Sequence, residues 1–145
     1  MTHNVADEQA TDCDATVMSL EEMESILGGI LIRARASLGV RAWGMQVMEL
    51  PHGFEHYPTH NHGDEGPDSR QEEVYVPLRG SATLELGDKR FKLAPGVVAR
   101  IGPNENRRIV PGPDGFRCLI IGGVPGEAYK PPAWTELGGP PPSLA

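Results

Sequence analysis

The sequence predicts an all-β fold, a closed antiparallel barrel or jelly roll with a short N-terminal helix. The chain has 18 glycines and 14 prolines but only 6% aromatic residues, a composition typical of many turns. Short apolar runs recur between residues 42 and 122, separated by glycine- and proline-containing turns. Turn signals at intervals of roughly eight to twelve residues are typical of barrels and sandwiches. We therefore expect about eight or nine short strands in this region.

Length and charge limit the classes of function. A chain of 145 residues is long enough for one domain with a buried core. The net charge of -7 gives no electrostatic basis for binding nucleic acid or an anionic membrane. No apolar run approaches the roughly 20 residues of a membrane span. The polar, acidic N-terminus resembles neither a secretory signal nor a transit peptide, so we expect a cytoplasmic protein.

Composition divides the chain into three parts. Residues 1–18 are acidic and weakly hydrophobic, which predicts a disordered tail. Residues 19–130 contain the barrel, together with an N-terminal helix and arm. Residues 131–145 form a tail rich in proline and glycine, and we expect its end to be loose. Two cysteines do not make a disulfide framework, and we expect Cys13 to be a loose thiol and Cys118 a small core residue.

The first predicted element is a helix from Ser19 to Leu27. Ser19 can cap it, with Glu22 three residues later as in a capping box, and two glycines follow the helix. The next segment, Ile30–Ala36, alternates between apolar and other residues, which favours a strand or an extended arm. Such an arm could pair two subunits, so we expect a homodimer. Arginines in and after it favour a solvated face over an anion site: Arg33, Arg35 and Arg41.

The barrel strands begin at Ala42–Leu50. Trp43, Met45 and Val47 share one face of this strand and Met48 and Leu50 the other, so both faces should be buried. Gly87-Asp88 predicts a tight hairpin turn. The later strands are expected at Glu73–Leu78, Ser81–Leu86, Phe91–Leu93, Val97–Ile101, Arg107–Val110 and Phe116–Gly122.

The residues that carry chemistry cluster between His52 and Gly80. In an extended segment, His60 and His62 point the same way, roughly 7 Å apart, so both imidazoles can reach one ion. A carboxylate from the next strand would complete a ligand set of two histidines and one carboxylate. The pair Glu72-Glu73 opens that strand, and buried acidic residues need a partner or a metal. Without those additional features, two histidines at this spacing could equally be surface residues on a loop edge.

These residues resemble the first motif of the cupin family, which runs from a glycine through HxH and a glutamate to a second glycine. Gly53 precedes His60-x-His62, and the six residues between Glu73 and Gly80 select Glu73 over Glu72 as the motif glutamate. The second cupin motif is matched by the Pro95–Asn106 stretch, PGVVARIGPNEN. The resemblance covers about residues 40–125. It implies a cupin barrel with one divalent transition metal (Fe, Mn, Ni, Zn or Cu) on His60, His62 and Glu73.

The sequence departs from the cupin pattern at two places. Ten residues separate His62 from Glu73, so a charged loop should lie at the mouth of the barrel. Arg107 stands where the family has its last histidine ligand, and an arginine cannot bind a metal. Three roles for Arg107 remain open. It could be a surface residue, it could hold an acidic group of the substrate, or it could pair with Glu72 or Glu73 in place of the ion.

Other side chains near the motif carry weaker predictions. Tyr75 follows Glu73 by two residues and should share its inward face, as a catalytic residue together with Arg107 or as a core residue. His56 could supply a third imidazole only if the strand is bulged, and His52 should be exposed. We expect Gln71 and Glu72 to face the mouth.

Three functions are compatible with this site. The resemblance implies a small-molecule metalloenzyme of the dioxygenase, isomerase or lyase type, with a small organic substrate that is acidic if Arg107 binds it. The first alternative is a non-catalytic module that binds or senses a small molecule, without metal if Arg107 replaces the last ligand. The second is a structural barrel whose site has decayed. The presence of His60, His62 and Glu73 together argues against a decayed site.

Overall fold

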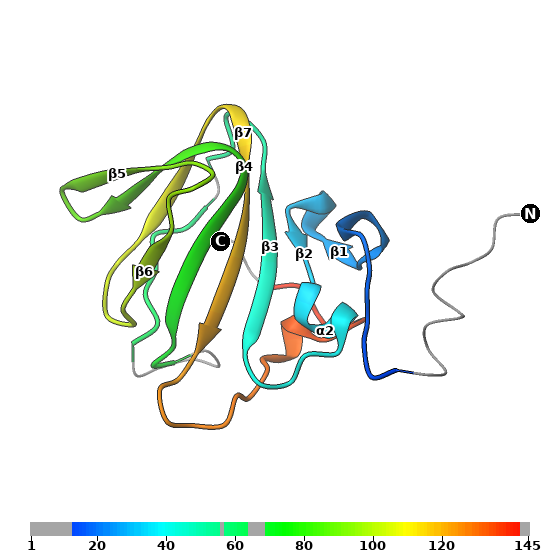
Figure 1. Cartoon of the computed structure of the whole chain (residues 1–145). Coiled ribbons are helices and arrows are strands. Elements are labelled where there is room, and N and C mark those ends of the chain that lie inside the picture. The colour runs from blue at the N-terminus through cyan, green and yellow to red at the C-terminus, as the bar shows by residue number, and fades with distance from the viewer. Residues whose placement is uncertain (1–12, 56, 64–68, 143–145) are drawn as a thin grey trace, which may run out of the picture.

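The computed structural model describes residues 13–55, 57–63 and 69–142, and these form one antiparallel sheet of seven strands (Figure 1). The strand order is β1-β2-β3-β7-β4-β5, with β6 paired to β4. None of the helices in the described ranges is long and apolar enough to cross a membrane. The strands are β1 (Ser25–Ile26), β2 (Leu31–Ile32), β3 (Gly44–Leu50), β4 (Glu72–Leu86), β5 (Lys89–Leu93), β6 (Ala99–Ile101) and β7 (Arg108–Gly123).

The two longest strands, β4 and β7, form the centre of the sheet. They pair from Glu72↔Gly123 to Glu85↔Arg108, with register shifts on either side of Gly80. Each was expected as two short strands, but each is one long strand that continues through an irregular pairing. The neighbour of β4 also changes along its length: β6 pairs with its first part, and β5 pairs with its second part.

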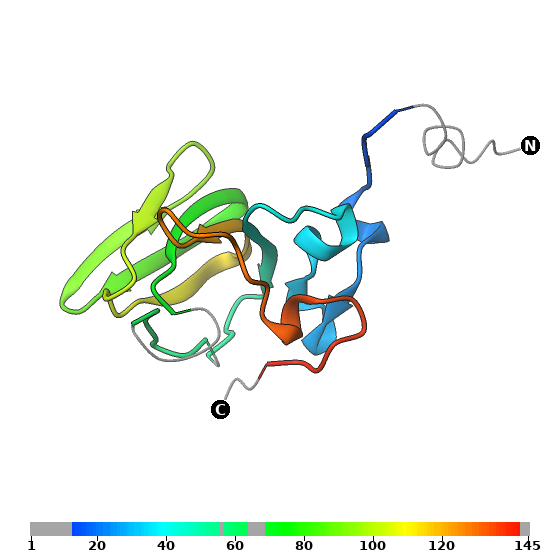
Figure 2. The ribbon, with the colours of Figure 1, turned by 90° about the horizontal axis from the view of Figure 1, so that it is seen from below.

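The expected closed barrel is wrong for the described residues, whose strand pairings form an open sheet. The free edge of β3 is taken by β2, where Leu31 pairs with Met48 and Ile32 with Val47. β2 pairs in turn with β1, which ends the sheet on that side. Figure 2 shows the N-terminal elements beside the curved sheet.

The expected helix over 19–27 is wrong. Only a 3-10 turn, η1 (Leu20–Glu22), forms there, and the Ser19 side chain makes no capping hydrogen bond. The chain then enters β1, because strand pairing with β2 and burial of Met23 outweigh the local helical signal. A second 3-10 segment, η2 (Leu27–Gly29), follows β1.

The described residues contain one short α-helix, α2 (Ala34–Leu38), where the sequence favoured a strand or arm. Gly39 ends it in the left-handed conformation, with φ of 80°, and its N–H donates to the carbonyls of Arg35 and Ala36. The preceding segment keeps only the two strand residues of β2, and both pair within this chain.

Arg33 is almost fully buried, at 1% exposure, so the expected solvated face is wrong for it. Its Nε donates to the carbonyl of Trp134 at 2.9 Å, and its Nη2 donates to that of Gly139 at 2.9 Å. Its Nη1 pairs with Glu24, which also accepts the N–H of Gly138. This Gly138 hydrogen bond, followed by the guanidinium, lowers the pKa of Glu24. The N-terminal region thereby holds the segment around η3 (Ala133–Thr135).

The remaining two arginines of that group differ from each other. Arg35 is buried and pairs with Glu136, which again departs from the expected solvated face. Arg41 is exposed, as expected.

Apolar residues pack on both faces of β3, as its pattern predicted. Met48 and Leu50 lie in one core cluster, with Tyr75, Phe116 and other residues. Val47 lies in a second cluster with Met23 and Ile32. Cys118 is a core residue, and burial raises the pKa of its thiol to about 12. Cys13 is exposed.

Candidate metal centre

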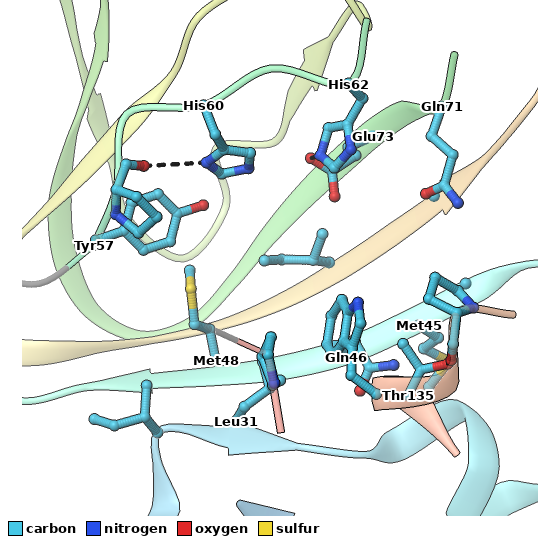
Figure 3. Close-up of a pocket in the computed structure, with 18 of the residues that line it drawn as sticks. Leu31, Met45, Gln46, Met48, Tyr57, His60, His62, Gln71, Glu73 and Thr135 are labelled. Atoms are coloured by element: carbon cyan, nitrogen blue, oxygen red, sulfur yellow. Dashed lines mark hydrogen bonds and ion pairs between the residues drawn. The ribbon is translucent and has the colours of Figure 1, made fainter. Parts of the chain in front are cut away.

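A cavity of about 330 Å³ lies between β3, the ends of β4 and β7, and the N- and C-terminal segments (Figure 3). Most of its lining is apolar, and histidine, glutamate and glutamine side chains supply the polar part. Figure 3 shows His60, His62, Gln71 and Glu73 on one wall, and Leu31, Gln46 and Met48 on the other. The C-terminal segment contributes Tyr129, Pro132, Trp134, Thr135 and Pro142.

The structure brings together His60, His62 and Glu73, as the motif predicted. One ligand atom from each lies within 4.8 Å of the others. The two imidazole rings stand edge to face, with centroids 5.2 Å apart, and Figure 3 shows both turned toward the cavity. Two segments therefore build the cluster, since Glu73 lies on β4 and both histidines precede that strand.

Backbone hydrogen bonds hold the two histidines in place. His60 and Arg107 exchange N–H to carbonyl bonds of 3.1 and 2.9 Å, which form an isolated β-bridge. The N–H of His62 donates to the carbonyl of Pro103 at 2.7 Å. The second motif therefore positions the first, although it provides no imidazole of its own.

The His60 ring is oriented for ligation through Nε2. Its Nδ1 lies 3.1 Å from the carbonyl of Pro58, and because a carbonyl can only accept, Nδ1 carries the proton. Burial, its largest influence, lowers the pKa of His60 and favours the neutral ring. A neutral histidine that donates its other N–H to a carbonyl is the usual arrangement of a metal ligand. The donor set therefore fits a transition metal.

Three side chains contact one oxygen of Glu73. Its Oε1 lies 2.9 Å from Nε2 of His62 and accepts from Nη1 of Arg107 at 3.0 Å. The hydroxyl of Tyr75 donates to the same oxygen at 3.3 Å. Of the three roles that the sequence left open for Arg107, the structure has the pairing with Glu73.

Arg107 is fully buried, and it is absent from the described residues that line the cavity. Its Nη2 donates to the carbonyl of Gly102. The guanidinium therefore lies behind Glu73, and the expected surface position is wrong.

Tyr75 is also fully buried, in the main core cluster, and it is likewise outside the described cavity lining. Its hydroxyl is hydrogen-bonded to that of Tyr57, which does line the cavity. Burial raises the pKa of both phenols, so both keep their protons.

Sequence reasoning missed Tyr57 and Gln46 in the lining. Gln46 alternates with Met48 and Leu50, so a polar residue at an inward position of β3 was a usable signal. Gln71, expected at the mouth, lines the cavity as well, whereas the neighbouring Glu72 pairs with Arg100 outside it.

Two further histidines, His52 and His56, precede the cluster in the sequence. His52 is exposed, as expected, with Nδ1 3.2 Å from the carbonyl of Gly112. The possible third ligand His56 lies outside the described residues, as do residues 64–68 of the expected mouth loop.

Solved structures share this fold. A cupin protein from Bacteroides fragilis matches with a TM-score of 0.59 and 22% identity, over 81% of this chain and 92% of that one. A protein with a double-stranded β-helix domain from Klebsiella pneumoniae matches with a TM-score of 0.57 and 19% identity, over 80% and 95%. No family model and no curated protein matches the sequence. At these identities the likeness concerns the fold, and the chain has the cupin fold.

Proposed function

We propose that the chain is a metal-dependent enzyme that acts on a small organic molecule held in the cavity. One divalent transition metal, Fe, Mn, Ni, Zn or Cu, would bind to His60, His62 and Glu73. The observation that carries the proposal is the position of this cluster, whose ligand atoms lie within 4.8 Å of one another on the wall of a cavity of about 330 Å³. Two imidazoles and one carboxylate leave coordination positions open toward the cavity.

The chain's own residues would prepare this site for chemistry. A bound metal would supply Lewis acidity toward a carbonyl or enolate oxygen, or redox chemistry with oxygen. Arg107 and Tyr75 act through Glu73, because both contact its Oε1 and neither is among the lining residues. Their contacts hold Oε1 of the carboxylate beside Nε2 of His62. Most of the cavity lining is apolar, so a bound substrate would displace water from the reacting groups. A dioxygenase, an isomerase and a lyase could all use this arrangement.

A second function is a metal-free binding or sensing module, and one observation favours it. Nη1 of Arg107 already lies 3.0 Å from the oxygen of Glu73 that faces His62. The ion pair could therefore take the place of the metal, and the cavity would then bind its ligand without chemistry.

The test is metal content in untagged protein. We expect about one equivalent of a transition metal in the wild type, and less than about a tenth of that in the His60→Ala/His62→Ala variant. His52→Ala is the matched control, because His52 is exposed and away from the cavity, and it should keep the full content. Full metal content in the double variant would show that the metal does not bind to His60 and His62. A wild type that takes up no metal on reconstitution would favour the metal-free module.

A homodimer and a cytoplasmic location also belong to the proposal. They rest on the sequence arguments alone, namely the apolar Ile30–Ala36 segment and the polar N-terminus. Sedimentation of the purified chain would test the dimer.

A further inference from the structure

The amide of Gln71 is an unpaired polar group that is accessible from the cavity. Gln71 has only 8% of its surface exposed, and it lines the cavity. No described residue makes a hydrogen bond with its amide, and the amide atoms are not sealed from the cavity as those of Gln46 are. Figure 3 shows the Gln71 side chain on the same wall as His62 and Glu73, and directed the same way.

A glycine on β7 makes room for this amide beside Glu73. Gly122 lies directly across from Glu73 in the sheet, so both positions belong to the same face. A Cβ on Gly122 would lie 2.8 Å from Oε1 of Gln71 and 3.6 Å from Cγ of Glu73. Gly122 is not in the left-handed conformation, so the space above it, and not its backbone, explains the glycine. Oε1 of Gln71 therefore lies next to the Glu73 side chain.

Two acceptors side by side require a donor from the molecule that fills the cavity. Oε1 of Gln71 and the carboxylate of Glu73 both accept hydrogen bonds, and nearly all buried polar groups in folded proteins are paired. A hydroxyl of a bound molecule can donate to Oε1 of Gln71. Nε2 of the same amide then donates to an acceptor that lies next to this hydroxyl. The complementary group therefore carries a donor and an acceptor on neighbouring atoms.

The surroundings of the amide favour a neutral molecule with an apolar body. No lysine or arginine lies among the described lining residues to neutralise an anion, and the carboxylate of Glu73 would repel one. Most of the lining is apolar, and side chains such as Met48, Ile120 and Trp134 offer contact area to a hydrocarbon or aromatic body. An α-hydroxycarbonyl group is neutral and has its donor and acceptor on adjacent carbons.

We infer that Gln71 determines substrate specificity by binding a neutral α-hydroxycarbonyl compound. Its Oε1 accepts from the hydroxyl of the compound, and its Nε2 donates to the carbonyl. The choice of a compound with two oxygens rests on the proposed function, because two imidazoles and one carboxylate leave open coordination positions for both. The hydrogen bonds to Gln71 do not depend on a metal, so the two proposals can fail separately.

The experiment compares three related probes. 2-Hydroxyacetophenone has the hydroxyl and the carbonyl, 2-methoxyacetophenone lacks the donor, and acetophenone lacks the second oxygen. Each is titrated by NMR into chelator-treated protein, so that no probe oxygen can bind a metal. In the wild type we expect 2-hydroxyacetophenone to bind at least about fivefold more tightly than either of the others. In Gln71→Leu this preference should disappear, whereas a preference that came from the size of the methoxy group would persist.

Gly122→Ala tests the position of the amide without removing it. The new methyl group displaces Oε1 of Gln71, which is the end of a flexible side chain, so the preference should be lost while the Tm changes by less than about 3 °C. Gly123→Ala is the matched control and should keep the preference, because no atom lies within 4 Å of its Cβ. Glu72→Gln should keep it as well, since Glu72 pairs with Arg100 outside the cavity.

Three results would overturn the inference. They are an unchanged preference in Gln71→Leu, an unchanged preference in Gly122→Ala, and the absence of saturable binding of 2-hydroxyacetophenone to the wild type.

Metal content, measured on untreated samples of the same proteins, tests the proposed function independently. A preference for 2-hydroxyacetophenone in a protein that takes up no metal would support the role of Gln71 and contradict the metalloenzyme. Metal binding without the preference would support the metal site and contradict the role of Gln71.

Discussion

Glu73 is the residue on which the candidate site depends, because one of its oxygens serves both the cluster and the core. Oε1 faces Nε2 of His62 and also accepts from the buried guanidinium of Arg107. A metal and Arg107 would therefore compete for electron density on the same atom. The ion pair should weaken metal binding while it stabilises the metal-free protein.

Replacing Arg107 separates these two effects. Arg107→Met should lower the free energy of unfolding of the metal-free protein by about 3 kcal/mol, because Glu73 is left without its buried cation. The same variant should bind zinc more tightly than the wild type. Chemical denaturation and competition with a chelator measure the two quantities. Zinc affinity that falls, or does not change, would contradict the competition. Arg108→Met, at a half-exposed neighbour, is the control and should change neither quantity.

The candidate ligands of the cluster could be predicted from the sequence, but the residues that surround them could not. The proximity of His60, His62 and Glu73 follows from alternation along extended segments and from motif spacing, which are local properties. The burial of Gln46 and Tyr57 depends on the cavity, whose walls come from segments far apart in the chain. Arg107 pairs with Glu73 and not with the adjacent Glu72, which pairs with Arg100. This difference also depends on packing.

At the scale of elements, β4 pairs with β6 before Gly80 and with β5 after it, and its pairing with β7 is irregular around Gly80. Gly80 has φ of 73°, and a Cβ at this position would lie 2.1 Å from the carbonyl oxygen of Gly115. Both the conformation and the close approach of β7 therefore require glycine. Before Gly80, Glu73–Tyr75 of β4 pair with β6, and after it Ala82–Leu86 pair with β5.

Alanine substitutions at two glycines should show how much this close approach contributes. Gly80→Ala should cost more than about 3 kcal/mol in the free energy of unfolding, since backbone must move to admit the methyl group. Gly87→Ala is the matched control, with φ of 62° but open space around its Cβ, and should cost about 1 kcal/mol. Urea denaturation measures both. Equal costs would show that conformation alone makes glycine necessary at Gly80.

Elements defined by local turns agree with the sequence, and those defined by long-range pairing do not. β3 and the Gly87-Asp88 hairpin lie where expected, because a two-residue turn and a doubly apolar strand are visible in short windows. The capping pattern at Ser19 is equally local, yet strand pairing between β1 and β2 prevailed over it. The register shifts that join two expected strands into β4 could not be read from a single segment.

For the molecule as a whole, the C-terminal segment completes the cavity. Trp134 and Thr135 line it, and Arg33 holds this segment through the carbonyls of Trp134 and Gly139. The N- and C-terminal parts of the described chain therefore form one wall together, in addition to the sheet. The sequence showed only a region rich in proline and glycine there, because a buried arginine that binds backbone carbonyls leaves no pattern in the segment it holds.

Removing the Arg33 side-chain charge should release this wall. Arg33→Met should lower the free energy of unfolding by about 2–3 kcal/mol and increase hydrogen exchange across residues 133–139. Exchange in β3 should stay slow. The exposed Arg41→Met variant provides the comparison and should leave both measurements unchanged. Exchange in 133–139 that stays at the wild-type level would show that packing of Trp134 and Thr135 holds the wall without Arg33.

The position of β7 has a consequence for biosynthesis. β7 lies between β3 and β4 in the sheet, although it is the last of the strands to be translated. Met48 of β3 pairs with Cys118, about seventy residues later, so β3 leaves the ribosome without its main partner. Until Gly123 has emerged, the apolar faces and unpaired edges of β3 and β4 are open to other nascent chains. Productive folding therefore has to wait until β7 has been translated, and chains that terminate before Gly123 should aggregate.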